Sequence, residues 1–568
     1  MNPKSQYGSV ATEAYRILDT KLLHNKSLQI PASIVDRLST VSFTPADTPP
    51  IIPTPCKISE SASALWALVG LFSAKIYEDR YGAGSQKVEV DVHQVTLFPF
   101  SAFLLEIGGK GMWDISLRDR TRHMDLGNFM EPYRALATNV YKARDGRFYH
   151  LHGGLNQTAI LDMLGLPQTR PDLSAKDAVI IKEIYAKAIA QHDSRWLDLE
   201  ANEFWRQAGT ICYTAEEFRQ TPHGNASANS PLYEIYNVQE DLPATAWPPA
   251  QAHKKKPLTG IKVLDLTRVI AGPTISKTLA LLGADVLRIS SKTVPEPSSI
   301  IFDMQIGKRD TSLNLKSKEG KLAFRTLVEE ADVIIDGYRP GALERMGFGR
   351  KWVHEMARRR GKGIVYAREN CYGWVGEWSH RSGWQQISDC VTGVSWEQGK
   401  FLGLDEPVVP LLPNSDYQTG VVGAVAILQA LVQRAETGGD YNVDLSLNQF
   451  NLWYLGLGLH DAHTGLQLLD KHPNFKPRHD SEVFLLLDMT RRTCTEATGT
   501  EKGDLFDPDR WTNGEINWGI VGEKARYLDW TRFMTFQSAS GEDDDLILSF
   551  DHGSCLPGSH EPTWSTVS

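Results

Sequence analysis

Short apolar runs alternate with segments of helical spacing in the second half of this 568-residue chain, and this alternation limits its fold more than any other feature. Residues 260–266, 284–289, 331–336 and 364–367 are rich in β-branched and other apolar residues, which predicts strands. Residues 273–282 and 318–330 have the spacing of helices, and Pro273 suits a first helical turn. We therefore predict an α/β fold: a doubly wound, parallel, Rossmann-like sheet with a second, smaller α+β domain.

Changes in composition divide the chain into parts. Residues 238–257 are rich in Pro, Ala and charge and are predicted to form an exposed linker. The linker separates an N-terminal half, 1–237, from a catalytic domain predicted for 258–464, and the smaller domain is placed at about 135–237. Residues 465–568 form a tail to which no chemistry is assigned, and its acidic stretch at 542–545 is predicted to be solvated surface.

A helix–turn–strand unit occurs twice. The sequence VEVDVHQV at 88–95 is matched by VDLSLNQF at 443–450. Each follows a long helical segment rich in small residues and a turn that contains glycine, and the second of these helices is predicted for 420–436. The matching order of elements favours an internal duplication.

Charge, cysteine content and hydropathy exclude several classes of protein. The chain has 60 Lys and Arg against 69 Asp and Glu, so it lacks the basic surface that nucleic acid or an anionic membrane requires. Its 6 cysteines form no CxxC pair, which excludes a disulfide scaffold and a zinc module, and no metal site is predicted. The N-terminus has no apolar signal core, and the longest apolar run, 420–432, is shorter than the ~20 residues that span a bilayer. These features predict a soluble, cytoplasmic protein.

Four collinear blocks resemble CoA-transferase family III, the group that includes formyl-CoA and carnitine-CoA transferases. They lie at 260–289, 307–320, 331–349 and 413–439. In the N-terminal half, residues 136–156 and 218–224 resemble the later part of such a chain. The order of the two parts is thus inverted relative to an ordinary member, and we interpret the chain as a rearranged or partly duplicated form.

The resemblance implies transfer of coenzyme A from an acyl-CoA to a carboxylic acid through an aspartyl anhydride. Such chemistry needs an accessible carboxylate nucleophile and amide donors for the developing oxyanion. Asp416 falls on the family's catalytic aspartate, just before the predicted helix 420–436, where the helix dipole is expected to keep it ionised. Read from local sequence alone, Asp416 is an ordinary N-cap. The corresponding place in the first copy falls near 59–61, so one active site per chain is expected.

Coenzyme A carries phosphates, so its site needs cations and backbone donors. The turn 268–273 joins a strand to a helix N-terminus, which is a ready anion site. The resemblance implies that the coenzyme contacts the turn and the following blocks, through Arg268, Val269, Ile270, Ala271, Lys308, Gly337, Tyr338, Arg339 and Arg345. The alternative for Lys308 and Arg345 is that they are ordinary solvated cations. Acyl-CoA and a carboxylic acid are the expected small-molecule partners, with no tightly bound cofactor.

Two other functions compete with CoA transfer. The same family contains α-methylacyl-CoA racemases, which need a histidine base to move the α-proton. Trp384 stands where that histidine would be, and His380 lies four residues out of register. Because indole cannot act as a base, the sequence favours a transferase. The second alternative is a CoA-binding relative without turnover.

Ordinary members close a run of glycines over the aspartate, and the C-terminal half lacks such a run. The nearest candidates are Gly108-Gly109 and Gly153-Gly154 in the N-terminal half, and activity requires one pair to reach Asp416. Ordinary members also interlock as dimers. We expect either a homodimer or a monomer whose fused halves imitate that dimer.

Overall fold

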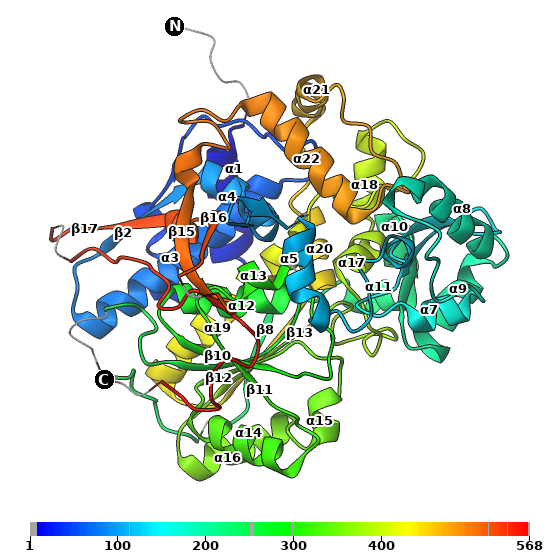
Figure 1. Ribbon diagram of the computed structural model, residues 1–568. Coiled ribbons are helices and arrows are strands. Elements are labelled where there is room, and N and C mark those ends of the chain that lie inside the picture. The colour runs from blue at the N-terminus through cyan, green and yellow to red at the C-terminus, as the bar shows by residue number, and fades with distance from the viewer. Residues whose placement is uncertain are drawn as a thin grey trace, which may run out of the picture.

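A seven-stranded sheet lies at the centre of the computed structural model, which describes residues 8–112, 114–239, 241–249, 255–297, 300–520, 522–541 and 544–565 (Figure 1). The strand order is β11-β10-β9-β12-β13-β14-β8, with all neighbours parallel except β14 and β8. The strands are β8 (Glu234–Asn237), β9 (Lys262–Leu266), β10 (Asp285–Ser290), β11 (Arg309–Ser312), β12 (Val333–Asp336), β13 (Val365–Asn370) and β14 (Tyr441–Ser446). The order reverses at β9, which opens a crevice at the carboxyl ends of β9 and β12.

The α/β class predicted from the sequence is confirmed, and one strand differs from expectation. β11 has the sequence RDTS, which carries no apolar pattern and predicts no strand. Its Arg309 pairs with Asp285 at 3.0 Å, and its Asp310 accepts from Arg288 at 2.9 Å. These charges neutralise one another between adjacent strands, so a charged sequence forms an edge strand of the sheet.

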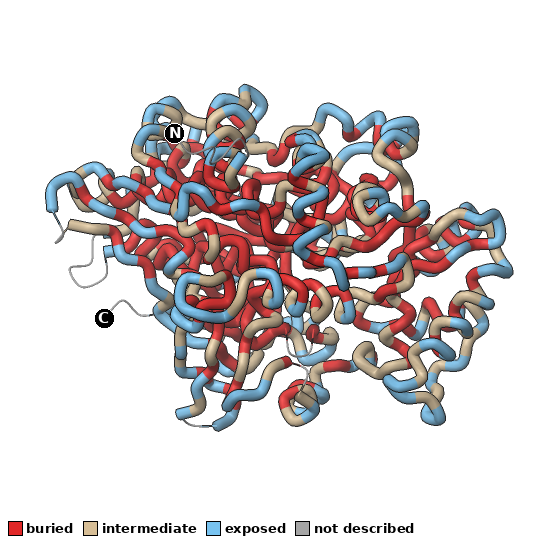
Figure 2. The backbone as a smooth tube through the Cα atoms, turned by 90° about the horizontal axis from the view of Figure 1, so that it is seen from above, coloured by how far each residue is buried: buried red, intermediate tan, exposed pale blue. Residues whose placement is uncertain are grey.

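Helices cover both faces of this sheet (Figure 1). Val263 and Val286 face α12 and α19, whereas Leu264 and Leu287, one residue further along each strand, face α14 and α16. The buried residues form a continuous band through the middle of the molecule (Figure 2). The helices of this part are α12 (Ala271–Leu281), α13 (Ile300–Met304), α14 (Lys318–Glu330), α15 (Ala342–Met346), α16 (Arg350–Arg360), α17 (Gln385–Thr392), α18 (Val394–Phe401), α19 (Asn414–Thr437) and α20 (Leu447–Leu455).

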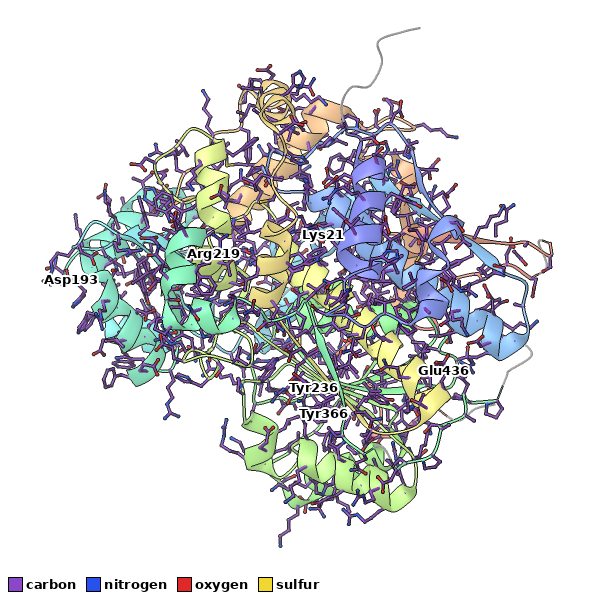
Figure 3. The ribbon with its side chains drawn as sticks, turned by 180° about the vertical axis from the view of Figure 1, so that it is seen from behind. Lys21, Asp193, Arg219, Tyr236, Tyr366 and Glu436 are labelled. Carbon is purple, nitrogen blue, oxygen red and sulfur yellow. The ribbon has the colours of Figure 1, made fainter. Side chains whose placement is uncertain are left out.

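One of these helices begins earlier than predicted. α19 starts at Asn414, directly after Pro413, so Asp416 lies inside the first turn and not in a preceding loop. Figure 3 shows the reverse side, with Glu436 near the far end of α19 and with Tyr366 of β13 and Tyr236 of β8 on the sheet. The Tyr366 hydroxyl donates to Asp336 at 3.0 Å, which ties β13 to β12.

A smaller α+β region has a sheet and a core of its own (teal, Figure 1). Its antiparallel strands are β5 (Asn139–Lys142), β6 (Phe148–His152) and β7 (Ala208–Ile211). The helices around them are α6 (Pro132–Ala135), α7 (Thr158–Met163), α8 (Ala178–Ile189), α9 (Ser194–Leu199), α10 (Ala215–Gln220) and α11 (Pro222–Ser227). β8, at the end of the predicted range 135–237, pairs with the large sheet instead. Of the predicted linker 238–257, residues 240 and 250–254 lie outside the described part.

The N-terminal part places a long helix against α19. α3 (Ile58–Tyr81) and α19 each have 24 residues, pack side by side, and are followed by six-residue strands, β2 (Gln86–Asp91) and β14. This parallel supports the duplication inferred from the sequence. Other elements here are α1 (Val10–Ile17), α2 (Ala32–Val35), β1 (Val41–Thr44), α4 (Val92–Thr96), β3 (Glu106–Ile107), β4 (Lys110–Gly111) and α5 (Ile115–Thr121).

The tail winds over both halves of the molecule. Its elements are α21 (Ala462–Lys471), α22 (Val483–Thr498), β15 (Trp511–Asn517), β16 (Lys524–Leu528), β17 (Met534–Ser538) and β18 (Ser554–Cys555). β17 pairs with β2, and the Trp564 ring N–H donates to Leu327 O of α14 at 3.1 Å. The predicted boundary at 464/465 falls inside α21.

The acidic stretch of the tail is partly described. Asp544 and Asp545 accept the backbone N–H groups of Gly84 and Ser538, each at 2.6 Å, while residues 542 and 543 lie outside the described part. Among the described residues, no helix is both long enough and apolar enough to cross a membrane.

Candidate functional site

The turn between β9 and α12 lies at the crevice and is strained. Val269 has φ of 74°, a left-handed conformation that is costly for a β-branched residue. Ile270 is the N-cap residue of α12, which begins at Ala271. The first amides of a helix have no partner within it and carry the positive end of the helix dipole, so this turn presents donors to the crevice.

Two glycines bring Asp416 to this turn. A Cβ added to Gly420 would lie 2.4 Å from Cβ of Thr274, and one added to Gly423 would lie 2.6 Å from Cδ1 of Ile275. α19 therefore crosses α12 at a distance that only glycine permits. Gly420 comes one helical turn after Asp416, so the close crossing fixes Asp416 beside the N-terminus of α12.

Asp416 lies where two cavities meet. The first has a volume of about 300 Å³ and extends along the β9, β12 and β13 strand ends. The second has a volume of about 100 Å³ and extends toward the smaller region and α22. The residues common to both are Val269, Ile270, Trp384 and Asp416. The carboxylate thus remains accessible from two sides.

The first cavity gathers most of the predicted coenzyme residues. Those that line it are Arg268, Val269, Ile270, Ala271, Gly337, Tyr338, Arg339 and Arg345. Lys308 is placed elsewhere, with none of its side chain exposed: its Nζ pairs with Asp265 at 3.0 Å and donates to Pro273 O at 2.9 Å. Lys308 is therefore neither a channel residue nor a solvated cation, and it supports the start of α12 from beneath.

Three arginines give this cavity its charge. Arg268 donates to Pro295 O at 2.7 Å and lies 5.8 Å from the Tyr338 ring centre, and Arg339 donates to Arg206 O at 3.0 Å. Within the described ranges, Arg268, Arg339 and Arg345 are not paired with a carboxylate. Arg381 also lines the cavity but is held by Asp198 at 3.1 Å and by Glu203. The first three guanidinium groups are thus available to an anionic ligand.

Burial raises the pKa of Asp416 well above its usual range, and the nearby acids Glu369 and Asp389 add to this effect. Burial also raises the pKa of Glu369 to about 7 and the pKa of Asp389 to about 7. Desolvation and two neighbouring acids thus oppose the stabilisation of the Asp416 carboxylate that is expected from the N-terminus of α19.

A stacked pair stands beside Asp416. Trp384 stacks on His152 of β6 with ring centres 5.1 Å apart and planes within 5°. His152 Nδ1 accepts the Gly154 N–H at 3.0 Å, and Nε2 lies 3.2 Å from Oε1 of Gln386. Burial lowers the pKa of His152 well below its usual range. The ring is therefore neutral, and both of its nitrogens are engaged.

The structure also locates the glycine pairs and His380. Gly154 lines the second cavity, and a Cβ added to it would lie 3.4 Å from Cζ2 of Trp384. Gly108 and Gly109 form the exposed turn between β3 and β4. The Gly153-Gly154 pair is thus the one that reaches the cavity of Asp416. His380 lies on the surface and pairs with Glu203 at 2.9 Å.

Several residues that line the second cavity were not predicted from the sequence. Phe103 and Phe129 come from the N-terminal half, and Phe484 and Leu487 come from α22 of the tail. These segments are far apart in the sequence, and nothing in an apolar run shows that it faces a cavity and not the core.

The first copy of the duplicated unit also holds an acid. Glu60 is the third residue of α3, as Asp416 is of α19. It is 2% exposed, lies 3.7 Å from His460 Nε2, and lines neither cavity. Glu60 therefore lies apart from the site that contains Asp416.

Several known proteins are similar to this chain. The family model described as CoA-transferase family III matches residues 258–481. The acetyl-coenzyme A transferase nodX of Hypoxylon pulicicidum is 36% identical over 574 residues, covering 98% of this chain and 93% of that protein. An acyl-CoA transferase of Gibberella moniliformis is 34% identical and covers 73% of each chain. A crystal structure of a CAIB/BAIF family protein from Brucella suis is 25% identical, covers 39% of this chain and 59% of that one, and has a TM-score of 0.31.

A crevice that joins a cationic cavity to a carboxylate, together with these matches, defines an acyl-CoA-handling enzyme. The chain belongs to CoA-transferase family III, which confirms the resemblance seen in its sequence.

Proposed function

We propose that this chain moves coenzyme A from an acyl-CoA to a carboxylic acid, with Asp416 as the nucleophile. The observation that carries the proposal is the position of Asp416 between a cavity lined by cations and a cavity lined by apolar side chains. A coenzyme A thioester has a polyanionic part and an acyl part, and its reacting carbon lies between them. Each part then has a cavity of matching chemistry.

The sheet and its cations support the placement of the coenzyme. The strand order from β11 to β14 supports the doubly wound arrangement predicted from the sequence, in which ligands lie at the carboxyl ends of the strands. In this proposal, Arg268, Arg339 and Arg345 neutralise the phosphates. The first amides of α12, beside Asp416, stabilise the oxyanion that forms on the thioester carbonyl.

The proposed reaction needs two rounds of the same chemistry. An Asp416 carboxylate oxygen attacks the thioester carbon, a C–O bond forms, and the C–S bond breaks to release the coenzyme as a thiolate. The thiolate attacks the Asp416 carbonyl of the mixed anhydride, which gives an aspartyl thioester and frees the donor acid. The acceptor carboxylate attacks this thioester and again releases the thiolate. The thiolate then attacks the acceptor carbonyl, which frees the new acyl-CoA and the Asp416 carboxylate.

The racemase alternative is less well supported. The histidine in the cavity is His152, whose Nδ1 accepts a backbone N–H and whose Nε2 faces Gln386. A base must have a free lone pair directed at the α-proton, and this ring lies flat against Trp384.

The test is the rate of CoA transfer in Asp416→Asn. Because the amide is isosteric but is not a nucleophile, we expect kcat to fall by at least ~10³-fold with the melting temperature retained. Asp405→Asn is the matched control, since Asp405 is an exposed acid outside both cavities. Full activity in Asp416→Asn would remove the basis of the proposal.

A further inference from the structure

The cavity on the acyl side of Asp416 is built from apolar side chains. Most of its described lining is aromatic or aliphatic: Phe103, Phe129, Ala135, Leu155, Val269, Ile270, Pro297, Ile300, Trp384, Pro413, Val483, Phe484 and Leu487. No lysine or arginine occurs among the described residues that line it.

One wall of this cavity comes from the tail. Val483 and Leu487 are one helical turn apart on α22 and face the cavity together with Phe484. Leu485, on the same helix, is 43% exposed and lies outside the cavity. Figure 1 shows α22 (orange) running along the top of the molecule. The tail thus contributes to the site of a reaction whose nucleophile lies in the preceding domain.

The polar groups that line the same cavity include no cation for a second carboxylate, and several of them are already engaged. Glu482 caps α22 and accepts the N–H groups of Phe484 at 2.8 Å and Leu485 at 2.7 Å, so the positive end of that helix is already satisfied. His152 is engaged at both nitrogens, and the Gln385 amide donates to Asp389. A second carboxylate here would lose its hydration, gain no cation, and meet an acidic side chain.

We propose that the acid served by this site is a monocarboxylate with an apolar body, and that α22 sets this preference. The proposal rests on the CoA transfer proposed above and deepens it by naming the class of acceptor. Its carboxylate reaches Asp416, and its apolar body lies among Phe129, Phe484 and Leu487. A dicarboxylate of equal length is disfavoured because its distal charge lies in the apolar part.

The test compares octanoate with suberate, which have equal carbon number and differ by the distal carboxylate. With acetyl-CoA as donor, we expect kcat/KM for octanoate to exceed that for suberate by about 100-fold in the unaltered enzyme. Equal or better use of suberate would overturn the proposal, and this comparison needs no variant to fold.

Phe484→Arg places a cation in the wall at a partly buried position. We expect it to raise the suberate-to-octanoate ratio of kcat/KM by at least about 10-fold, whereas Leu485→Arg, on the exposed side, leaves the ratio unchanged. An unchanged ratio in a folded Phe484→Arg protein would contradict the role given to α22.

A separate measurement of the donor half-reaction distinguishes this inference from the function on which it rests. If neither acid accepts CoA but acetyl-CoA and hydroxylamine still modify Asp416, the proposed transfer stands and the acceptor class is wrong. If Asp416 is not modified either, the proposed function itself fails.

Discussion

At the scale of the residue, the ionisation of Asp416 has the clearest consequence. Only the carboxylate form attacks a thioester, and burial together with Glu369 and Asp389 raises its pKa. Activity is therefore expected to fall as the pH is lowered through this raised pKa, at a higher pH than an exposed aspartate would give. A more basic carboxylate is also a stronger nucleophile once it is ionised.

Replacing one neighbouring acid tests this cause. In Glu369→Gln a negative charge near Asp416 is removed, so the pKa of Asp416 falls. We expect the acid limb of the kcat/KM profile to move to lower pH. Glu355→Gln, an exposed acid on α16, is the control and should leave the limb in place. An identical limb in all three proteins would show that Glu369 does not act on the nucleophile.

Single residues were predictable where a local pattern carried them. The turn at 268–271 and Asp416 stand in motifs, and the structure places them together at one crevice. Lys308 was misplaced because its partner Asp265 is 43 residues away, and no local pattern reveals a buried ion pair of that kind. Phe129 and Phe484 had no signal because an apolar residue on a cavity wall looks like an apolar residue in a core.

At the scale of the element, the crossing of α12 and α19 positions the chemistry. In Gly420→Ala the added methyl group would lie 2.4 Å from Cβ of Thr274, so the helices must separate. We expect a loss of about 1–3 kcal/mol in the free energy of unfolding, measured by urea denaturation. Transfer activity should fall as well, since Asp416 moves away from the amides of α12.

The matched control is a helical glycine with room around it. At Gly465 in α21 an added Cβ would meet Phe401 at 3.5 Å, an ordinary contact. Gly465→Ala should therefore raise the stability by up to ~1 kcal/mol and leave transfer unchanged. Equal stability changes in the two variants would argue against the close crossing.

The elements themselves were predictable to different degrees. β9, β10, β12 and β13 follow from runs of apolar and β-branched residues that are buried on both faces. β11 did not follow, because Arg309 and Asp310 are compensated by residues on a neighbouring strand. The first six residues of α19 were not predicted to be helical, because Asn, Ser and Asp are typical of a cap as well as of a first turn.

At the scale of the whole molecule, α19 packs between two helices of the same chain. One is α12 of the catalytic domain, and the other is α3 of the N-terminal half. Nineteen residues of the 24-residue α3 are buried, and the helix packs along α19. A helix from a second copy would have no free face of α19 on which to pack in the same way. We infer that the fused halves take the place of the interlocked subunits expected of an ordinary member.

This inference predicts a monomer in solution. Light scattering on the purified chain should give a mass near 63.4 kDa at all concentrations tested. A stable mass of twice that value would show that the chain still dimerises and that the fusion serves another purpose.

The most direct test of the whole account is chemical capture of the intermediate at Asp416. The protein is incubated with acyl-CoA and hydroxylamine, digested, and mapped by mass spectrometry, with Asp416→Asn as the control. The proposed mechanism predicts a hydroxamate on the peptide that contains Asp416, dependent on both reagents and absent from the variant. A fully active protein that gives no adduct at Asp416, or an adduct at a different acid, would contradict the mechanism.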